Sequence, residues 1–476
     1  MDTPRFYYFY SLVLLVLVNV PSFASEDERP NIILIMADDM GYADAGFTGS
    51  NDINTPNLDA LAANGVIFEQ AYVTHPFCGP SRAGIMAGRH QARFGFESNP
   101  AFDRANTVMG IDQKEKLFPA RLQDVGYKTA LIGKWHLGAS EVFHPNNRGF
   151  DYFYGFLGGG HDYFRIDMTE PVDEGYLDGL MRNGQPAGFD GYLTTALSRD
   201  AVSFIKQHVN DSKAQPFFLF LSYNAPHGPL QAPAEDIQRH SHIENNKRRV
   251  YAAMVDVMDR GIGEIVSTLK ETQQLENTLV FFLSDNGGPI PTERHPYAGN
   301  GSSNAPFKAG KGSFSEGGVR VPFIAHWPKK IAKNRRFSLP ISALDIAATS
   351  VGLAKGDSSQ LEGVNLVPYI RGDNASPPHK YLYWRGGAYV EGRWSVRDAY
   401  GNKHLFNVGS QAPTLYKLHD DIKEAHDIVG EEPDLADALH SHWLNWNERN
   451  APLKIHGYRE YHRLRNEFYK QAVPNK

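Results

Sequence analysis

The stretch "NIILIMADD", residues 31–39, decides the fold class. An unbroken apolar run, Ile32–Ala37, ends in two carboxylates, Asp38 and Asp39. A continuous apolar run of this length is typical of a strand that is buried on both faces, as in a parallel sheet. The stretch therefore predicts an interior strand with acidic side chains at its carboxyl end.

The same pattern recurs along the chain, separated by helical segments. "NTLVFFLSDNGG" (277–288) is a second apolar run, and it ends in Asp285 and Asn286. Residues 249–271 carry apolar side chains at helical spacing, and "TPNLDALAANG" (55–65) has helix start and stop signals. Strands that alternate with helices predict an α/β sandwich with a large, mostly parallel sheet. Ligands of such sheets gather at the carboxyl ends of the strands.

Three segments are predicted: a signal peptide (1–24), a catalytic domain (25–375) and a smaller C-terminal subdomain (376–476). The first has an apolar run at 12–20 followed by small residues near position 24, which is typical of a secretory signal and too short for a membrane span. An uncleaved anchor is the alternative. We expect a secreted or periplasmic protein with no stable membrane insertion after cleavage. The C-terminal segment predicts a small antiparallel sheet with a closing helix at 434–446.

Charge and cysteine content limit the function classes. The formal net charge of −6 gives no general attraction to nucleic acid, so we predict no such partner. Cys78 is the only cysteine, so the chain can form no internal disulfide. It directly precedes a predicted helix that starts at Pro80, which leaves two interpretations: a reactive thiolate or a buried structural thiol.

The strand-end side chains and several cations predict an anion site. Carboxylate and amide oxygens at both strand ends suit a hard cation, calcium or magnesium. Arg82 and Lys134 beside such a cation would stabilise an oxyanion. His136, two residues after Lys134, His227 in "NAPHGPL" and Lys311 in a glycine-rich loop could complete the site.

These motifs resemble the type I, formylglycine-dependent sulfatases of the alkaline-phosphatase-like superfamily. "CGPSR" (78–82) resembles the first family signature and "GYKTALIGKWHLG" (126–138) the second. "APHGP", "SDNGG" and "GKGSFSEGGVRVP" follow in the family order, and the resemblance covers residues 30–322. Phe77 and Ala87 depart from the usual pattern, which bears on how efficiently the cysteine is modified.

The resemblance implies that a maturase oxidises Cys78 to Cα-formylglycine, so a lone thiol needs no partner. It also implies a calcium ion, preferred over magnesium. The implied metal ligands are Asp38, Asp39, Asp285, Asn286 and an oxygen of residue 78.

The resemblance further assigns roles to five side chains. Arg82 would steady the attacking oxygen of residue 78. Lys134 and Lys311 would bind the sulfate oxygens. His227, helped by Lys311, would protonate the departing alcohol, and His136 would deprotonate the second hydroxyl of the hydrated aldehyde.

The expected substrate is a sulfated carbohydrate, with a carrageenan-like algal galactan favoured. The segment 150–164 is rich in aromatic rings, resembles segments of bacterial polysaccharide sulfatases, and contains His161 after three glycines. We predict that His161 contacts the sugar. Two alternatives stay open: a phosphonate or phosphate ester hydrolase of the same superfamily, and a non-catalytic protein that binds sulfated glycans with Cys78 unmodified.

Overall fold

The structure is a computed structural model. It describes residues 29–165, 179–212, 215–291, 299–387, 392–407 and 409–454, with the single residues 3 and 463. The predicted signal peptide therefore lies, apart from residue 3, outside the described residues. Within the described part, no helix has the length and hydropathy needed to cross a membrane.

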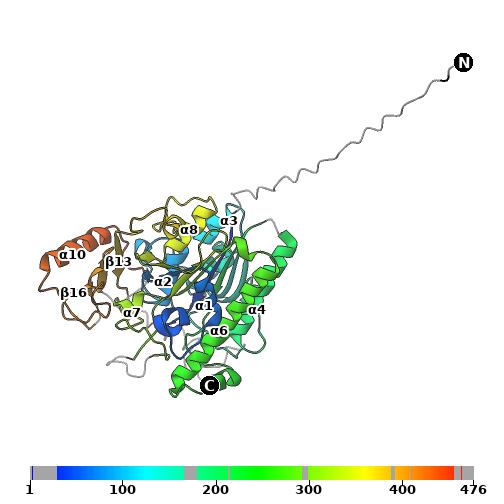
Figure 1. The fold of residues 1–476 in the computed structure, drawn as a ribbon, viewed down its shortest axis with the longest axis horizontal. Coiled ribbons are helices and arrows are strands. Elements are labelled where there is room, and N and C mark those ends of the chain that lie inside the picture. The colour runs from blue at the N-terminus through cyan, green and yellow to red at the C-terminus, as the bar shows by residue number, and fades with distance from the viewer. Residues whose placement is uncertain are drawn as a thin grey trace.

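A ten-stranded mixed sheet forms the centre of the molecule (Figure 1). In spatial order its strands are β11 (Arg335–Phe337), β2 (Val66–Phe68), β10 (Phe323–His326), β9 (Thr278–Ser284), β1 (Asn31–Ala37), β8 (Phe217–Ser222), β4 (Lys128–Lys134), β5 (Tyr152–Phe156), β6 (Met181–Arg182) and β7 (Gln185–Pro186). The five strands from β9 to β5 are parallel, and antiparallel neighbours follow on both sides. The prediction of a large, mostly parallel sheet is confirmed.

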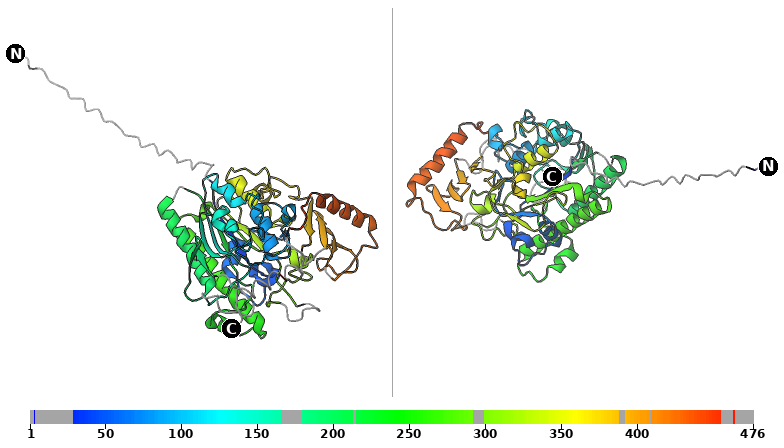
Figure 2. Two further views of the ribbon diagram at one scale, coloured as in Figure 1. Left: turned by 180° about the vertical axis from the view of Figure 1, so that it is seen from behind. Right: turned by 45° about the horizontal axis from the view of Figure 1, so that its top comes forward.

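Helices cover both faces of the sheet, as the alternation of side chains along β1 requires. Ile32 and Leu34 pack in the cluster that contains α2, α3 and α8, whereas Ile33 and Ile35 pack in the cluster of α1, α4 and α6. Helices α4 and α6 lie side by side on their face (Figures 1 and 2). The helices are α1 (Pro56–Ala63), α2 (Cys78–Ala87), α3 (Phe118–Gln123), α4 (Leu193–Ser212), α5 (Ala234–Arg239), α6 (Asn246–Glu271), α7 (Glu316–Val319), α8 (Asp345–Leu353), α9 (Val367–Arg371) and α10 (Pro433–Asn447).

A smaller antiparallel sheet lies at one end of the molecule (Figures 1 and 2). Helix α10 packs across it, and Trp394, Val396 and Trp443 share the apolar cluster between helix and sheet. This confirms the predicted C-terminal sheet with a closing helix. Its strands are β13 (Tyr381–Arg385), β14 (Trp394–Asp398), β15 (Asn402–Phe406) and β16 (Thr414–Lys417), and a separate two-stranded sheet pairs β3 (Ala71–Tyr72) with β12 (Ile341–Ser342).

Candidate active site

Two neighbouring strands deliver the acidic side chains to one place. Strands β1 and β9 are parallel, with Ala37 opposite Ser284, so the residues after each strand leave the sheet at the same edge. The backbone N–H of Asp39 donates to Oδ1 of Asp285 at 3.2 Å. The side-chain amide of Asn286 donates to Oδ1 of Asp39 at 2.7 Å. The structure thus brings together the two strand-end pairs singled out in the sequence.

Cys78 faces these carboxylates from the first turn of α2. The predicted start of this helix at Pro80 is wrong by two residues, because the helix begins at Cys78 with Phe77 as its N-cap. Proline is tolerated anywhere in the first turn, where backbone N–H groups have no intrahelical acceptor, so it does not mark the first residue uniquely. Sγ of Cys78 lies 3.8 Å from Oδ1 of Asp39.

Three cations, of which Arg82 and Lys134 are fully buried, each pair with one of the carboxylates. Nε of Arg82 lies 2.8 Å from Asp285, and Nζ of Lys134 lies 2.6 Å from Asp38. Nζ of Lys311 lies 2.7 Å from Oδ1 of Asp39. Burial opposes the ionisation of Asp39, but Lys311 and then His227 outweigh it and lower the pKa of this carboxyl. The fixed charges of the site therefore nearly balance.

The thiol of Cys78 is not a thiolate in this environment. Lys311 donates to Sγ at 3.2 Å. Burial nevertheless raises the pKa of the Cys78 thiol far above its usual value, and the lowering effects of Lys134 and Lys311 do not compensate. A nucleophilic cysteine needs a lowered pKa. The interpretation of Cys78 as a reactive thiolate is therefore disfavoured.

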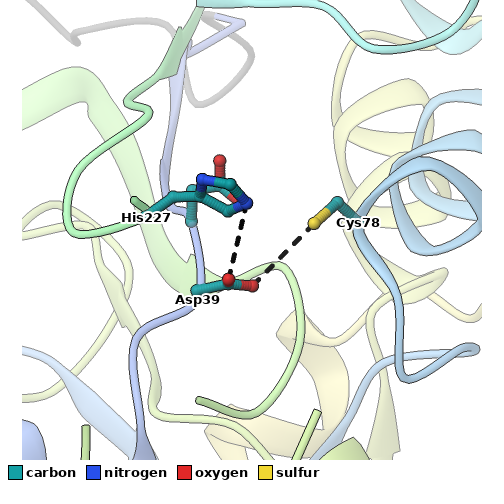
Figure 3. Close-up of side chains that lie close together, drawn as sticks. Asp39, Cys78 and His227 are labelled. Carbon is teal, nitrogen blue, oxygen red and sulfur yellow. Dashed lines mark hydrogen bonds and ion pairs between the residues drawn. The ribbon is translucent and has the colours of Figure 1, made fainter. Parts of the chain in front are cut away.

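His227 lies opposite Cys78 across the Asp39 carboxylate (Figure 3). Its Nε2 is 3.6 Å from Oδ2 of Asp39, and its Nδ1 is 2.7 Å from the carbonyl oxygen of Gly228. A carbonyl can only accept, so in the neutral ring Nδ1 carries the hydrogen and Nε2 presents its lone pair to the site. Burial lowers the pKa of His227 to about 4, so the ring is neutral at neutral pH.

His136 follows β4 in a left-handed backbone conformation, with φ of 60°. The backbone at His136 is therefore not extended, so the alternation of side chains that would place His136 on the same face as Lys134 does not apply. Burial, followed by the charges of Lys134 and Arg82, lowers the pKa of His136 well below its usual value. Among the described residues its Nδ1 is buried without a hydrogen-bond partner. A Cβ on Gly159 would lie 2.8 Å from Nε2 of His136, so the glycine run lets the backbone approach this ring.

The prediction that His161 contacts the substrate is not supported. Its side chain is fully buried, with ring centroids 5.2 Å from Phe156 and 6.3 Å from Phe189. Most rings of 150–164 are core residues too, although Phe164 is 46% exposed. The aromatic segment supplies β5 and its packing, which explains its composition without a ligand.

Residues of the C-terminal subdomain contact the loop that carries Lys311. The sequence did not reveal this contact. The side chain of Asn407 accepts from the backbone of Phe314 at 2.8 Å and donates to Ser315 at 2.9 Å. Lys403 lies 2.8 Å from Glu316, at the end of the loop. Lysines and asparagines in a small predicted sheet are expected to face solvent, so no local pattern in the sequence predicted the contacts of this subdomain with the loop.

Ser222 is a further residue of the site that sequence reasoning missed. It ends β8, and its Oγ accepts from Nη1 of Arg82 at 2.6 Å. A polar residue that closes an otherwise apolar strand next to the acid-bearing strand is the signal that could have identified it.

The donor set fits a divalent cation. Among the described residues, Oδ1 of Asp38 and Oδ1 of Asn286 are buried oxygens without a hydrogen-bond partner. Four residues could together hold a metal ion, because one ligand atom of each lies within 4.8 Å of the others. They are Asp38, Asp39, Cys78 and His227. Carboxylate and amide oxygens suit calcium. Because the fixed charges nearly balance, such a cation would leave the site positive and suited to an anionic ester.

Disruption of this candidate metal site is expected to abolish turnover. Asp38→Asn should lower kcat/KM by at least about 10²-fold, because it removes a charged oxygen ligand and the ion-pair partner of Lys134. Chelation followed by dialysis should have the same effect, with recovery on adding calcium. Asp124→Asn, at an exposed acid, is the matched control. Full activity of both chelated enzyme and Asp38→Asn would rule out a metal at this position.

The fold and this constellation define a hydrolase of the alkaline-phosphatase-like class. A family model described as "Sulfatase" matches residues 30–356. The chain belongs to the sulfatase family, and it is a hydrolase of sulfate esters.

Relatives and solved structures extend this likeness beyond the motifs. N-acetylgalactosamine-6-sulfatase of Canis lupus familiaris is 33% identical over 381 residues, covering 76% of this chain and 70% of that protein. Steryl-sulfatase of Homo sapiens is 31% identical over 463 residues, covering 82% and 77%. The crystal structure of Ps i-CgsB in complex with k-i-k-neocarrahexaose is 38% identical, with a TM-score of 0.82, and covers 94% of this chain and 98% of that one.

Proposed function

We propose that the chain removes sulfate from a sulfated carbohydrate, with a carrageenan-like galactan favoured, and uses a formylglycine formed from Cys78 together with bound calcium. The observation that carries the chemistry is the neutral, fully buried thiol among three carboxylates and three cations. Such a thiol is poorly suited to attack, whereas an aldehyde at the same position would be well placed. A formylglycine-generating maturase would be the partner that makes it.

The bound groups would supply two kinds of chemistry. The hydrated aldehyde would supply a nucleophilic hydroxyl, and calcium would act as a Lewis acid that stabilises negative charge. Asp38, Asp39, Asp285 and Asn286 would hold the metal. The chain's own cations bind and orient the sulfate group. Lys134 and Lys311 stabilise charge on its oxygens, and Arg82 stabilises the charge on the oxygen of residue 78.

We assign proton transfer to the two histidines of the site. His227 presents Nε2 toward the site, and because its pKa is lowered to about 4 it must take up a proton there before passing it to the departing alcohol. The ammonium group of Lys311, which contacts the same carboxylate, is the adjacent charged donor. His136, whose Nδ1 is buried without a hydrogen-bond partner among the described residues, accepts a proton from a hydroxyl of residue 78.

Two likenesses support a carbohydrate substrate. Ps i-CgsB was solved with a carrageenan oligosaccharide and is similar to this chain over nearly its whole length. The N-acetylgalactosamine-6-sulfatases are named for a sulfated sugar. Steryl-sulfatase is similar over a comparable span, so small apolar sulfates are the competing substrates.

A substrate panel separates these possibilities. Enzyme made together with a maturase is incubated with sulfated carrageenan oligosaccharides, a steroid sulfate, an aryl sulfate and an aryl phosphonate, and free sulfate or phosphonate is measured. We expect sulfate release from the oligosaccharides at the highest kcat/KM. Turnover confined to steroid and aryl sulfates would contradict the carbohydrate assignment, and preferred phosphonate cleavage would restore the first alternative.

The role of His227 makes a separate prediction. His227→Ala should reduce kcat for a sugar sulfate by about 10²–10⁴-fold, because a sugar alcohol is a poor leaving group that needs protonation. An activated aryl sulfate should lose much less, since its phenol leaves without a proton. His240→Ala, at a buried histidine of α5's C-cap, is the control. Equal losses on both substrates would make His227 a sulfate-binding residue instead of an acid.

A further inference from the structure

The turn that carries His227 depends on donors from outside itself. It follows β8 with the sequence "NAPHGP" (224–229), in which Pro226 and Pro229 have no backbone N–H group. The backbone N–H of His227 donates to the carbonyl of Asn224 at 2.8 Å, which closes the turn. Residues 224–226 are buried, so their carbonyls must find hydrogen-bond donors in the protein.

The side chain of Tyr163 reaches both ends of this turn. Its hydroxyl oxygen lies 2.7 Å from the carbonyl oxygen of Asn224 and 2.8 Å from that of His227. Carbonyl oxygens can only accept, so the one hydroxyl hydrogen is shared between them. The ring of Tyr163 is fully buried and stacks on Tyr192, with centroids 5.3 Å apart and planes inclined by 18°, which fixes the direction of the hydroxyl.

Two other groups hold the middle of the turn. The backbone N–H of Asp38 donates to the carbonyl of Ala225 at 3.1 Å. The side-chain amide of Asn300 donates to the carbonyl of Pro226 at 3.2 Å. These donors reach the middle of the turn, whereas the hydroxyl of Tyr163 reaches the carbonyl of the histidine itself.

Tyr163 is held by contacts that do not involve its hydroxyl. Its backbone N–H donates to Oε1 of Gln231 at 2.9 Å, and Nε2 of Gln231 donates to Oδ2 of Asp162 at 2.9 Å. Its carbonyl accepts from the backbone N–H of Leu193, at the start of α4, at 2.9 Å. Replacement of the hydroxyl alone should therefore leave the backbone and the ring of residue 163 in place.

We propose that Tyr163 is a positioning residue for His227: its hydroxyl holds the turn so that Nε2 of the histidine stays directed at the departing oxygen. The tyrosine is fully buried and acts through the backbone of the turn, without contact to the substrate. Proton transfer needs the donor within about 2.6–3.2 Å of the accepting atom, so a small shift of the turn is costly. The proposal rests on the proposed role of His227 as the acid, and it gives the segment 150–164 a function other than sugar binding.

The test compares two tyrosine-to-phenylalanine variants of the full-length, matured enzyme. Tyr163→Phe removes the hydroxyl that reaches the turn. Tyr154→Phe is the matched control, because Tyr154 lies in the same segment, is 3% exposed and donates its hydroxyl hydrogen to the carbonyl of Gly188 at 2.9 Å. Each variant is assayed with aryl sulfates whose phenols leave with graded ease, and kcat is expressed per aldehyde-bearing molecule.

Tyr163→Phe should lower kcat by about 10–10²-fold for the phenols that leave least readily, and far less for those that leave most readily. Tyr154→Phe should keep the leaving-group dependence of the parent enzyme. The thermal midpoints of the two variants should fall by similar, small amounts, since each loses a buried hydrogen bond. In the His227→Ala background, Tyr163→Phe should cost no further activity, because its effect passes through the histidine.

Additive losses in the double variant would overturn the proposal. An unchanged leaving-group dependence in Tyr163→Phe would also overturn it, and His227→Ala distinguishes the two causes. If His227→Ala alone steepens the dependence, only the positioning role fails; if neither variant does, the assignment of His227 as the acid fails with it. Aryl sulfates need no glycan recognition, so these outcomes do not depend on the carbohydrate assignment.

Discussion

Cys78→Ala is expected to lower sulfate-ester turnover by about 10⁴-fold or more, the scale of losing a nucleophile that acts within a catalytic unit. In the proposed reaction residue 78 supplies the attacking oxygen, whereas the nearby hydroxyls of Ser222 and Ser284 are already hydrogen-bonded, to Arg82 and to the backbone carbonyl of Asn286. The measurement is kcat/KM for an aryl sulfate, which needs no glycan recognition.

Stability is the control for this variant. The thiol is neutral and buried, so alanine removes one small apolar group, and the thermal midpoint should fall only slightly. Cys78→Ser tests the modification itself, because a maturase that acts on cysteine should leave serine unconverted. Activity of Cys78→Ala within about tenfold of the parent enzyme would remove residue 78 from the mechanism.

The second large effect is expected on stability, from Lys403→Met. Lys403 is fully buried between Glu316 and Glu424, at 2.8 and 3.2 Å. Its removal leaves two buried carboxylates with one fewer cation, which should cost about 3–5 kcal/mol of unfolding free energy. Denaturant unfolding gives this value directly.

A matched control lies on the neighbouring strand. Lys417 pairs with Glu432 at 2.6 Å, but both side chains are more than 40% exposed. Exposed pairs contribute little to stability, so Lys417→Met should leave the unfolding midpoint nearly unchanged. Similar losses of unfolding free energy in both variants would show that burial of the Lys403 cluster does not stabilise the packing of the subdomain on the main fold.

Lys403→Met should also affect catalysis. Glu316 follows the loop that bears Lys311, and Asn407 of the same subdomain bonds the loop backbone. A loop released from these contacts should hold Lys311 less firmly. We therefore expect a larger loss in kcat than in KM for an aryl sulfate, measured well below the unfolding temperature.

The central strands and their acids could be predicted because local sequence determines them. Apolar runs such as Ile32–Ala37 must be buried, and parallel pairing then places Asp38 and Asp285 at one edge without further information. The positions of Arg82 and Lys134 could be predicted for the same reason, since the elements that bear them end or begin at that edge of the sheet.

Other features depended on packing that no local pattern encodes. The rings around His161 could face a sugar or a core with the same sequence, and the structure places them in the core. Lys403 meets Glu316 across 87 positions of the chain. Long-range contacts of this kind follow from how the two sheets dock, which the sequence of either segment does not specify.

The most direct test of the central claim is the chemical state of residue 78, measured together with activity. Protein produced with graded amounts of maturase is digested, the peptide that spans residue 78 is analysed by mass spectrometry after hydrazide trapping, and kcat is measured on the same samples. The account predicts that kcat rises in proportion to the aldehyde fraction and extrapolates to zero without it. Full sulfate-ester turnover by protein that contains only the thiol would contradict it.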